Sequence, residues 1–368
     1  MKKKKLGVYI GRLQPVHHAH LRAIRLALSK VEHLAIVLGS ACQAKTVKNP
    51  WTTDEREKMI RGCLTPEENA SVSLIAAKDY MYRDNVWLSA VQSGLSPLGF
   101  DDVDDGDVLL FGHDKDRSTF YLHLFPTWRF EDTGNLGDID ATRVRSRFFI
   151  GDIDGLREVA PLSAYEQMVA EMKFHDPKTT HEMLREMMNK QVFDPKEYGP
   201  TTKYEDLVLE YNHVLEYKKM WKVAPFPVTF VTTDAIIIKS GHILVGVRGG
   251  YPGRGLIAVP GGYINPNERI IDCCVRELKE ETQIAVPADE LKKNVVDTHV
   301  FDHPDRSLRG RVITHAHCIN LGSGPLPKVT GKDDMKKAFW MPLRDVLRRE
   351  EDFFEDHFHM IDFFVSRF

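Results

Sequence analysis

The sequence lacks the features that would tie it to a membrane or to an oxidising compartment. No uninterrupted apolar run approaches the roughly 18 residues that a membrane-spanning helix needs. The five cysteines are odd in number and have no Cys-x-x-Cys spacing, which indicates reduced thiols rather than a disulfide framework. The basic start MKKKKLGVYIGR has too short an apolar run for a signal peptide. We therefore expect a cytoplasmic protein without a membrane partner.

An excess of charge of one sign is also missing. The 368 residues include 50 Lys and Arg against 53 Asp and Glu, which gives a formal net charge of -3, and both signs are mixed along the chain. This balance argues against a general binder of nucleic acid or of a membrane surface. The sequence has no internal repeat and no low-complexity tract, and its length suits two domains better than one.

The first third of the chain alternates strand patterns with helical patterns. Residues 6–10 and the continuous apolar run 34–38 predict buried strands, and residues 19–30 carry apolar side chains at helical spacing. A strand, a helix and a strand in this order form a βαβ unit, so we expect a parallel sheet. Further strands are predicted at 72–76 and 108–111, a helix including 84–91, and a short basic helix over 141–150 that ends at Gly151.

The second half predicts a separate domain. The breaker run DPKEYGP (194–200) places the boundary near Pro200, and we expect domains over 1–190 and 225–368 with a linker and connecting helix over 191–224. Two apolar runs that flank Ser240-Gly241 predict a hairpin. A Gly/Pro-rich loop, a charged helix at 269–282, and short strands at 298–301 and 312–319 follow, and amphipathic helices complete the chain.

The segment GRLQPVHHAH (11–20) lies where the first predicted strand ends and the next helix begins. Ligands bind at this edge of an open parallel sheet, and a helix N-terminus favours phosphate. His17 and His20 are three residues apart and can share one helical face, with Arg12 within reach. We interpret this cluster as a polyphosphate cradle. The alternatives are surface histidines at a turn, or a metal site, which would lack an acidic or cysteine ligand nearby.

A second loop-to-helix segment, IDATRVR (139–145), offers the Thr142 hydroxyl and the side chains of Arg143 and Arg145. Over residues 1–190 the sequence resembles the nicotinamide mononucleotide (NMN) adenylyltransferases of the HxGH nucleotidyltransferase superfamily. The resemblance rests on both segments and on KNPWTTDER (48–56), DYMYRDNVWLSAVQ (79–92) and GHDKDRSTFYLHLFPTW (112–128). The sequence departs from the family pattern at Ala19, where the family has glycine, at Leu13, where it has Phe, and at Asp140-Ala141, where it has two serines.

The resemblance implies a Rossmann-like domain in which the NMN phosphate attacks the α-phosphorus of ATP, so that pyrophosphate leaves and NAD forms. Such a transfer depends on positioning and charge neutralisation and needs no protein nucleophile. The implied ATP-binding residues are Gly11, Arg12, His17, His20, Thr142 and Arg145, of which His17, His20 and Arg145 are catalytic. Trp87 would stack on the nicotinamide ring near Asp84 and Asn85, whereas the alternative is a core aromatic side chain. Another pyridine or flavin mononucleotide as acceptor stays open.

Carboxylates are concentrated in the segment GYINPNERIIDCCVRELKEETQI (262–284). Glu277 and Glu281 are four residues apart on one helical face, where like charges repel each other. A bound hard divalent cation would offset this repulsion. Mg²⁺ binds a few carboxylates together with phosphate and water. A solvated acidic helix face is the alternative. The segment matches the Nudix pattern G-x5-E-x7-R-E-U-x-E-E-x-G-U throughout, except that Gln283 stands at the late glycine.

Residues 225–368 therefore resemble a Nudix hydrolase domain, and the tandem order resembles the bacterial bifunctional NMN adenylyltransferase/ADP-ribose pyrophosphatases. The resemblance implies an α/β/α sandwich with a mixed sheet, in which Glu277 and Glu281 hold Mg²⁺, or Mn²⁺ in its place, and Glu280 assists. The domain would hydrolyse ADP-ribose to AMP and ribose 5-phosphate. The implied partners are ATP, NMN, NAD and ADP-ribose, and a homo-oligomer stays open.

The segments at 300–311 and 331–343 resemble the substrate-side loops of the same enzymes. The resemblance implies that Arg306, Arg309 and Arg311 contact phosphate or ribose, and we also expect Arg248, at the end of the predicted hairpin, to bind substrate. Asp333 and Asp334 would supply a further acid or base. A solvated arginine face is the alternative for this run of arginines. For the whole domain, the alternative is a sensor that binds ADP-ribose or NAD without hydrolysing it.

Overall fold

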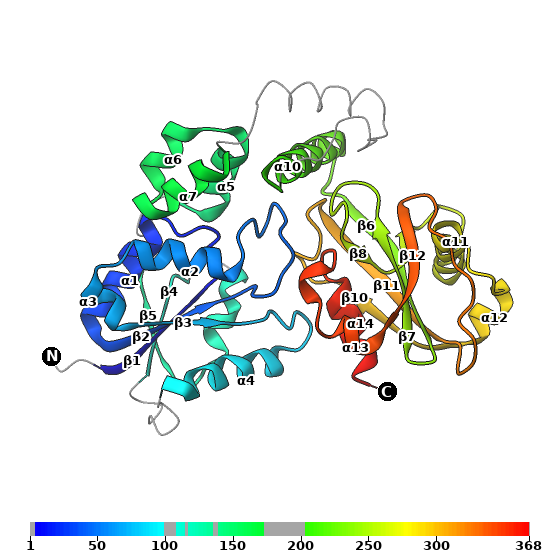
Figure 1. Ribbon diagram of the computed structural model, residues 1–368, viewed down its shortest axis with the longest axis horizontal. Coiled ribbons are helices and arrows are strands. Elements are labelled where there is room, and N and C mark those ends of the chain that lie inside the picture. The colour runs from blue at the N-terminus through cyan, green and yellow to red at the C-terminus, as the bar shows by residue number, and fades with distance from the viewer. Residues whose placement is uncertain (1–3, 99–107, 115–116, 135–138, 173–202, 368) are drawn as a thin grey trace. The chain divides into compact units, whose positions relative to one another are not determined.

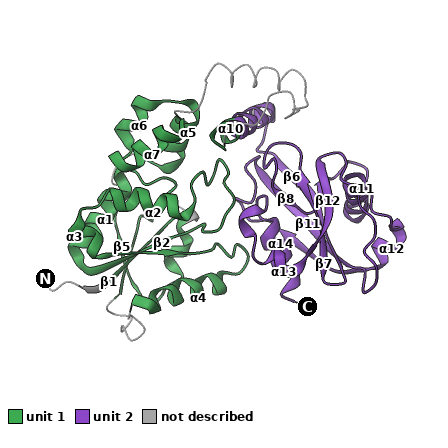
Figure 2. Ribbon diagram, in the orientation of Figure 1, with its two compact units in different colours: residues 1–186, 195–208 green, residues 187–194, 209–368 purple. Residues whose placement is uncertain are grey.

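The computed structural model describes residues 4–98, 108–114, 117–134, 139–172 and 203–367. The chain divides into two compact units, residues 1–186 with 195–208 and residues 187–194 with 209–368, which we describe separately (Figure 2). The expected boundary near Pro200 lies outside the described residues. The expected domain limits of 1–190, 191–224 and 225–368 stay a prediction. In the described part of the chain, we find no helix that combines the length and the apolar character needed to span a membrane.

Unit 1 contains the expected parallel sheet, with five strands in the order β3-β2-β1-β4-β5. This is the strand order of a Rossmann-like sheet, and the direction in which strands are added reverses between β1 and β4. The strand β5 is short and half-exposed, and it was not among the predicted elements. The strands are β1 (Lys4–Gly11), β2 (Val31–Leu38), β3 (Val72–Ala76), β4 (Val108–Gly112) and β5 (Arg129–Asp132).

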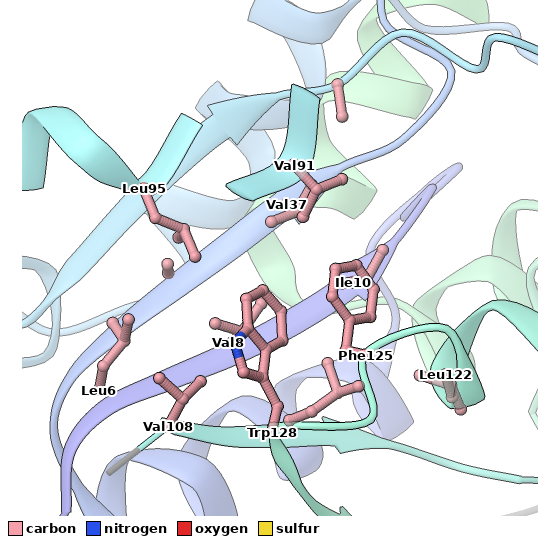
Figure 3. Close-up of a cluster of buried hydrophobic side chains, with 13 residues drawn as sticks. Leu6, Val8, Ile10, Val37, Val91, Leu95, Val108, Leu122, Phe125 and Trp128 are labelled. Atoms are coloured by element: carbon pink, nitrogen blue, oxygen red, sulfur yellow. The ribbon is translucent and has the colours of Figure 1, made fainter. Parts of the chain in front are cut away.

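Helices alternate with the first four strands of unit 1, as predicted. Gly151 ends α5 with a φ of 75°, a left-handed conformation that glycine adopts without strain. Figure 3 shows one core cluster, in which Leu6, Val8 and Ile10 of β1 pack with Val91 and Leu95 of α4 and with Trp128. The helices are α1 (His18–Lys30), α2 (Thr53–Gly62), α3 (Pro66–Ala70), α4 (Asp84–Leu95), α5 (Ala141–Ile150), α6 (Ile153–Val159) and α7 (Leu162–Met172).

Unit 2 contains a mixed seven-stranded sheet whose main order is β10-β11-β6-β7-β12. The parallel pair β11–β6 lies among antiparallel pairs, and the predicted hairpin turns at Ser240 and Gly241, both with positive φ. The segment 331–343, expected as a loop, instead forms β12, which pairs with β7. The strands are β6 (Thr229–Lys239), β7 (His242–Arg248), β8 (Ile257–Ala258), β9 (Gly261–Tyr263), β10 (Val295–Phe301), β11 (Arg311–Asn320) and β12 (Met335–Pro342).

Helices cover both faces of this sheet and complete the α/β/α sandwich (Figure 1). Cys274 and Leu278 of α11 pack against Ala235 and Ile237 of β6 on one face. On the other face, aromatic side chains of α14 contact Phe301 of β10. The boundary between the two units falls within the helix α10. The helices are α10 (Lys203–Met220), α11 (Ile270–Thr282), α12 (Ala288–Lys293), α13 (Leu343–Val346) and α14 (His357–Val365).

Candidate functional sites

Two histidines begin the helix α1 at the carboxyl end of β1. His17 is the N-cap, and its Nδ1 accepts the backbone N–H of His20 at 3.4 Å, while Nδ1 of His20 accepts the backbone N–H of His17 at 3.3 Å. The rings stack with their centroids 3.6 Å apart. Because each Nδ1 is an acceptor, a neutral ring carries its proton on Nε2. The capping arrangement therefore fixes both the orientation and the tautomer of the two imidazoles.

Burial keeps these imidazoles neutral at pH 7. It lowers the pKa of His17 to about 4, and the nearby Asp140 raises that pKa only in part. Burial, followed by the neighbouring His17, also holds the pKa of His20 well below its usual value. In the absence of a ligand each ring therefore offers an N–H donor rather than a full positive charge, and the permanent charges of the site come from arginines. A bound polyphosphate would favour the protonated rings.

The segment IDATRVR lies beside this pair, as the phosphate interpretation expects. Arg145 of α5 is buried, and it donates from Nη1 to the carbonyl of Gln14 at 2.7 Å and from Nη2 to Oγ1 of Thr142 at 3.2 Å. It thereby fixes the loop between Arg12 and His17 through the backbone of Gln14. Burial, together with the cationic Arg12, lowers the pKa of Arg145 to about 10, so the two guanidinium groups are close enough to repel. An anion placed between them would relieve that repulsion.

Asp140, which stands where the resembling family has serine, is the N-cap of α5. Its carboxylate accepts the backbone N–H of Arg143 at 2.9 Å. Aspartate is among the preferred N-cap residues, and capping is worth roughly 1 kcal/mol. The departure from the family pattern therefore keeps the start of the helix that carries Thr142 and Arg145.

Trp87 of α4 is half-buried, and its packing bears on the two roles that the sequence left open. Its ring packs on the core cluster of Figure 3 and meets Tyr121 and Phe125 with centroids 6.1 and 5.8 Å apart. Asp84 and Asn85, at the start of the same helix, are exposed. The remaining exposed part of the indole is compatible with stacking on a ligand ring, which stays a prediction.

Sequence reasoning missed two side chains that organise this edge of unit 1. Arg56 of α2 is fully buried and donates to backbone carbonyls of the loops that follow β1 and β2. Asp79 accepts both the backbone N–H and the hydroxyl of Ser40, each at 2.8 Å. The available signal was Thr52-x-x-Glu55, a capping box that starts α2 and places Arg56 in its first turn.

In unit 2, the helix α11 presents its carboxylates to the glycines of β9. Glu281 is buried and accepts the backbone N–H of Gly261 at 2.9 Å. A Cβ atom on Gly262 would lie 2.4 Å from the carboxyl carbon of Glu277, so any other residue there would displace this carboxylate. Arg276 links the cluster by donating to Glu268, Glu277 and Glu280 at 2.6, 2.7 and 2.9 Å.

The electrostatics of these carboxylates indicate a site for a cation. Burial, with smaller contributions from the neighbouring Glu277 and Asp334, raises the pKa of Glu281 to about 8. Burial, together with Glu280 and Asp333, also raises the pKa of Glu277. A bound cation would offset both the burial and the mutual repulsion.

The donor set fits a hard divalent cation such as Mg²⁺ or Mn²⁺, because every predicted ligand is a carboxylate oxygen. Among the residues that the structure describes, however, no three acidic, histidine or cysteine side chains already converge as a metal site. Arg276 pairs with two of the three predicted ligands, Glu277 and Glu280, whereas Glu281 is fixed by Gly261. Gln283 ends α11 with a φ of 48°, so it adopts the left-handed turn at the position where the Nudix pattern has glycine.

Three of the predicted substrate-binding arginines have different environments. The guanidinium groups of Arg248 and Arg309 lie 4.2 and 5.9 Å from the ring centre of Phe354. Burial, with a smaller contribution from the cationic Arg309, lowers the pKa of Arg248. Arg306 is instead buried, and it forms a two-point ion pair with Asp356 at 2.8 and 2.9 Å. We therefore give Arg306 a structural role and retain Arg248 and Arg309 as the candidate anion-binding pair.

A side chain that sequence reasoning did not identify supports the loop beside this pair. Glu210 of α10 is buried and accepts the backbone N–H of Gly253 at 2.9 Å, while Arg248 donates to the carbonyl of Pro252 at 3.0 Å. No sequence signal marks Glu210, because its contact depends on how α10 packs.

Comparison with known proteins identifies both halves of the chain. Residues 8–118 match the cytidylyltransferase-like family, and residues 229–364 match the NUDIX domain family. The nicotinamide/nicotinic acid mononucleotide adenylyltransferase of Acinetobacter baylyi is 35% identical over 148 residues, which are 40% of this chain and 76% of that protein. The nicotinamide-nucleotide adenylyltransferase of Thermococcus onnurineus is 32% identical over 163 residues, 44% of this chain and 81% of that protein.

Similarity to solved structures extends over both units. The bifunctional NMN adenylyltransferase/ADP-ribose pyrophosphatase of Francisella tularensis, complexed with AMP and a manganese ion, superimposes with a TM-score of 0.85. It is 29% identical and covers 99% of both chains.

Proposed function

We propose, from the premise that the chain belongs to the nicotinamide-nucleotide adenylyltransferase family and also carries a NUDIX domain, that it is a bifunctional enzyme of NAD metabolism. Unit 1 transfers AMP from ATP to NMN, which gives NAD and pyrophosphate. Unit 2 hydrolyses ADP-ribose to AMP and ribose 5-phosphate. The observation that carries the proposal is that each unit gathers the charged groups of its own motif, around His17 in unit 1 and around Glu281 in unit 2.

In adenylyl transfer, the chain acts by holding phosphates rather than by forming a covalent intermediate. The backbone N–H groups at the start of α1, the Nε2–H groups of His17 and His20, and the guanidinium groups of Arg12 and Arg145 provide the donors for the ATP phosphates. Negative charge increases on these phosphates as the bond to pyrophosphate breaks. Donors that are already oriented stabilise that charge without reorganisation. Trp87 would hold the ring of NMN by stacking.

In hydrolysis, unit 2 binds a diphosphate between acidic and basic side chains. When bound, a divalent cation supplies Lewis-acid polarisation of the diphosphate and lowers the pKa of an attacking water. Glu281 and Glu277 would hold this cation, and Glu280 would assist. Arg248 and Arg309 would contact the diphosphate oxygens, and Asp333 or Asp334 would accept or donate a proton.

The direct test is to identify the products. The protein is incubated with Mg²⁺ or Mn²⁺ and, separately, with NMN plus ATP, nicotinate mononucleotide plus ATP, and ADP-ribose. We expect a dinucleotide and pyrophosphate from the first or second mixture and AMP with ribose 5-phosphate from the third. Bound but uncleaved ADP-ribose would replace the hydrolase proposal for unit 2 with the sensor alternative.

A further inference from the structure

Arg56 of α2 is an arginine with no exposed surface and a complete set of hydrogen bonds. A guanidinium group has five N–H donors in one plane. In Arg56 all five have an oxygen acceptor, either a backbone carbonyl or a hydroxyl. The acceptors are the carbonyls of Arg12 at 2.6 Å, Gly39 at 2.8 Å, Ser40 at 3.3 Å and Thr52 at 3.3 Å, and Oγ1 of Thr53 at 3.3 Å.

These acceptors lie where two neighbouring strands end. Arg12 follows β1, and Gly39 with Ser40 follows β2, so three of the carbonyls are at the carboxyl edge of the parallel sheet. Ligands bind at this edge in sheets of this kind. Arg56 therefore ties together the two loops that form one side of the proposed ATP site.

Both loops contain a residue in a strained backbone conformation. Leu13 has a φ of 46° and Ser40 a φ of 52°, in the left-handed region that residues other than glycine rarely adopt. Arg56 donates to the carbonyl of Arg12, which belongs to the peptide bond between Arg12 and Leu13. It also donates to the carbonyl of Ser40. Such strain persists only where surrounding contacts hold it, and it is concentrated at functional sites.

The charge of Arg56 also affects the site. Burial lowers its pKa to about 10, the nearby Asp79 raises it and Arg12 lowers it, so Arg56 stays a cation at pH 7. The carboxylate of Asp79 accepts its hydrogen bonds from Ser40 rather than from Arg56. Arg56 thus adds a fixed positive charge behind Arg12.

We propose that Arg56 is a positioning residue for adenylyl transfer, which fixes the backbone of Arg12 and the Gly39–Ser40 turn and thereby places the Arg12 guanidinium against the ATP phosphates. Arg56 does not touch the substrate. This inference rests on the proposed function of unit 1. Because lysine offers three donors from one atom, it cannot reproduce a planar set of five bonds.

The test is Arg56→Lys in the full chain, with Arg61→Lys as the control. Arg61 lies on the same helix, is partly exposed and pairs with Glu57 at 3.0 Å. We expect Arg56→Lys to lower kcat/KM for ATP in NAD formation by about tenfold or more, since small misplacements of a positioning group cost that much. The control should keep the wild-type value, and ADP-ribose hydrolysis should be unchanged in both variants.

A double-mutant cycle with Arg12→Ala separates positioning from simple loss of stability. If Arg56 acts through Arg12, Arg56→Lys should have little further effect on kcat/KM once Arg12 is alanine, at a temperature where all variants are folded. Additive effects, or full activity of Arg56→Lys, would overturn the inference. Wild-type protein without adenylyl transfer would instead contradict the proposed function. If the lysine variant does not fold, Thr53→Ala takes its place in the cycle. This variant keeps the guanidinium group and removes one acceptor, so we expect a smaller loss of kcat/KM that again disappears when Arg12 is alanine.

Discussion

His17 and His20 stack on each other with ring centroids 3.6 Å apart, and each ring accepts the backbone N–H of the other residue. One pair of side chains therefore caps α1 and keeps the proton of each neutral ring on Nε2. The residues that begin the helix are therefore the same ones that we propose as donors to the phosphates. Capping and catalysis can nevertheless be separated by substitution, because asparagine caps a helix but lacks the imidazole.

We expect both His17→Ala and His17→Asn to lower NAD formation by about 10²-fold, because each removes an oriented donor to the phosphates. Only the alanine variant should also lose the cap, which is worth roughly 0.5–2 kcal/mol. Steady-state rates and thermal melts of both variants check this expectation. Thr65→Ala is the matched control, because it removes the capping box of α3 and should lower the melting temperature without changing the rate. An active His17→Asn enzyme would contradict the phosphate role of this ring.

The lowered pKa of His17 predicts how stability depends on pH. Its pKa is about 4 in the folded chain against 6.5 for an unperturbed imidazole, so between these values the unfolded chain binds more protons. The free energy of unfolding should therefore fall as the pH drops below 6.5, by about 2 kcal/mol at pH 5 from this group. Denaturant titrations of unit 1 at pH 7.5 and pH 5 should show a smaller fall for His17→Asn than for the wild type. Equal falls would show that His17 is not buried in its neutral form.

Much of the fold follows from patterns within single segments, whereas the tertiary contacts do not. The alternation in unit 1, the hairpin at Ser240-Gly241 and the charged helix α11 are local patterns, and the structure confirms them. The carbonyl of Arg12 that Arg56 contacts and the partner of Arg306 are distant in the sequence, so no spacing marks them. The strand β12 does not follow from the sequence, because its segment resembles the substrate-side loops of known enzymes and its pairing with β7 is a tertiary contact.

Trp87 packs on the core of unit 1, and we propose that it also stacks on the ring of NMN. We expect Trp87→Ala to raise KM for NMN more than KM for ATP, because stacking on an aromatic side chain is worth roughly 1–3 kcal/mol per base. Trp87→Phe keeps an aromatic face and should recover most of the NMN affinity. The measurements are KM for both substrates and a thermal melt. Equal effects on the two KM values, together with a lowered melting temperature, would leave Trp87 as a core residue only.

Two arginines of unit 2 should respond differently to the same substitution. Arg309→Met should raise KM for ADP-ribose by about tenfold or more with little change in melting temperature, because its side chain is partly exposed and faces Tyr263 and Phe354. Arg306→Met should instead destabilise the protein by roughly 3–5 kcal/mol, because it leaves the buried carboxylate of Asp356 without its partner. Kinetics and denaturant titrations of the pair test this division. Equal loss of stability in both variants would contradict it.

The central claim is that one chain carries two independent sites, and the most direct test measures both activities of His17→Asn and Glu281→Gln. Glu281→Gln should lower AMP release from ADP-ribose by at least about 10²-fold and leave NAD formation unchanged. Without metal it should also raise the melting temperature of unit 2, because a buried carboxylate whose pKa is about 8 is replaced by a neutral amide. His17→Asn should show the reverse pattern of activities. Loss of both activities from either folded variant, or full hydrolysis by Glu281→Gln, would contradict the account.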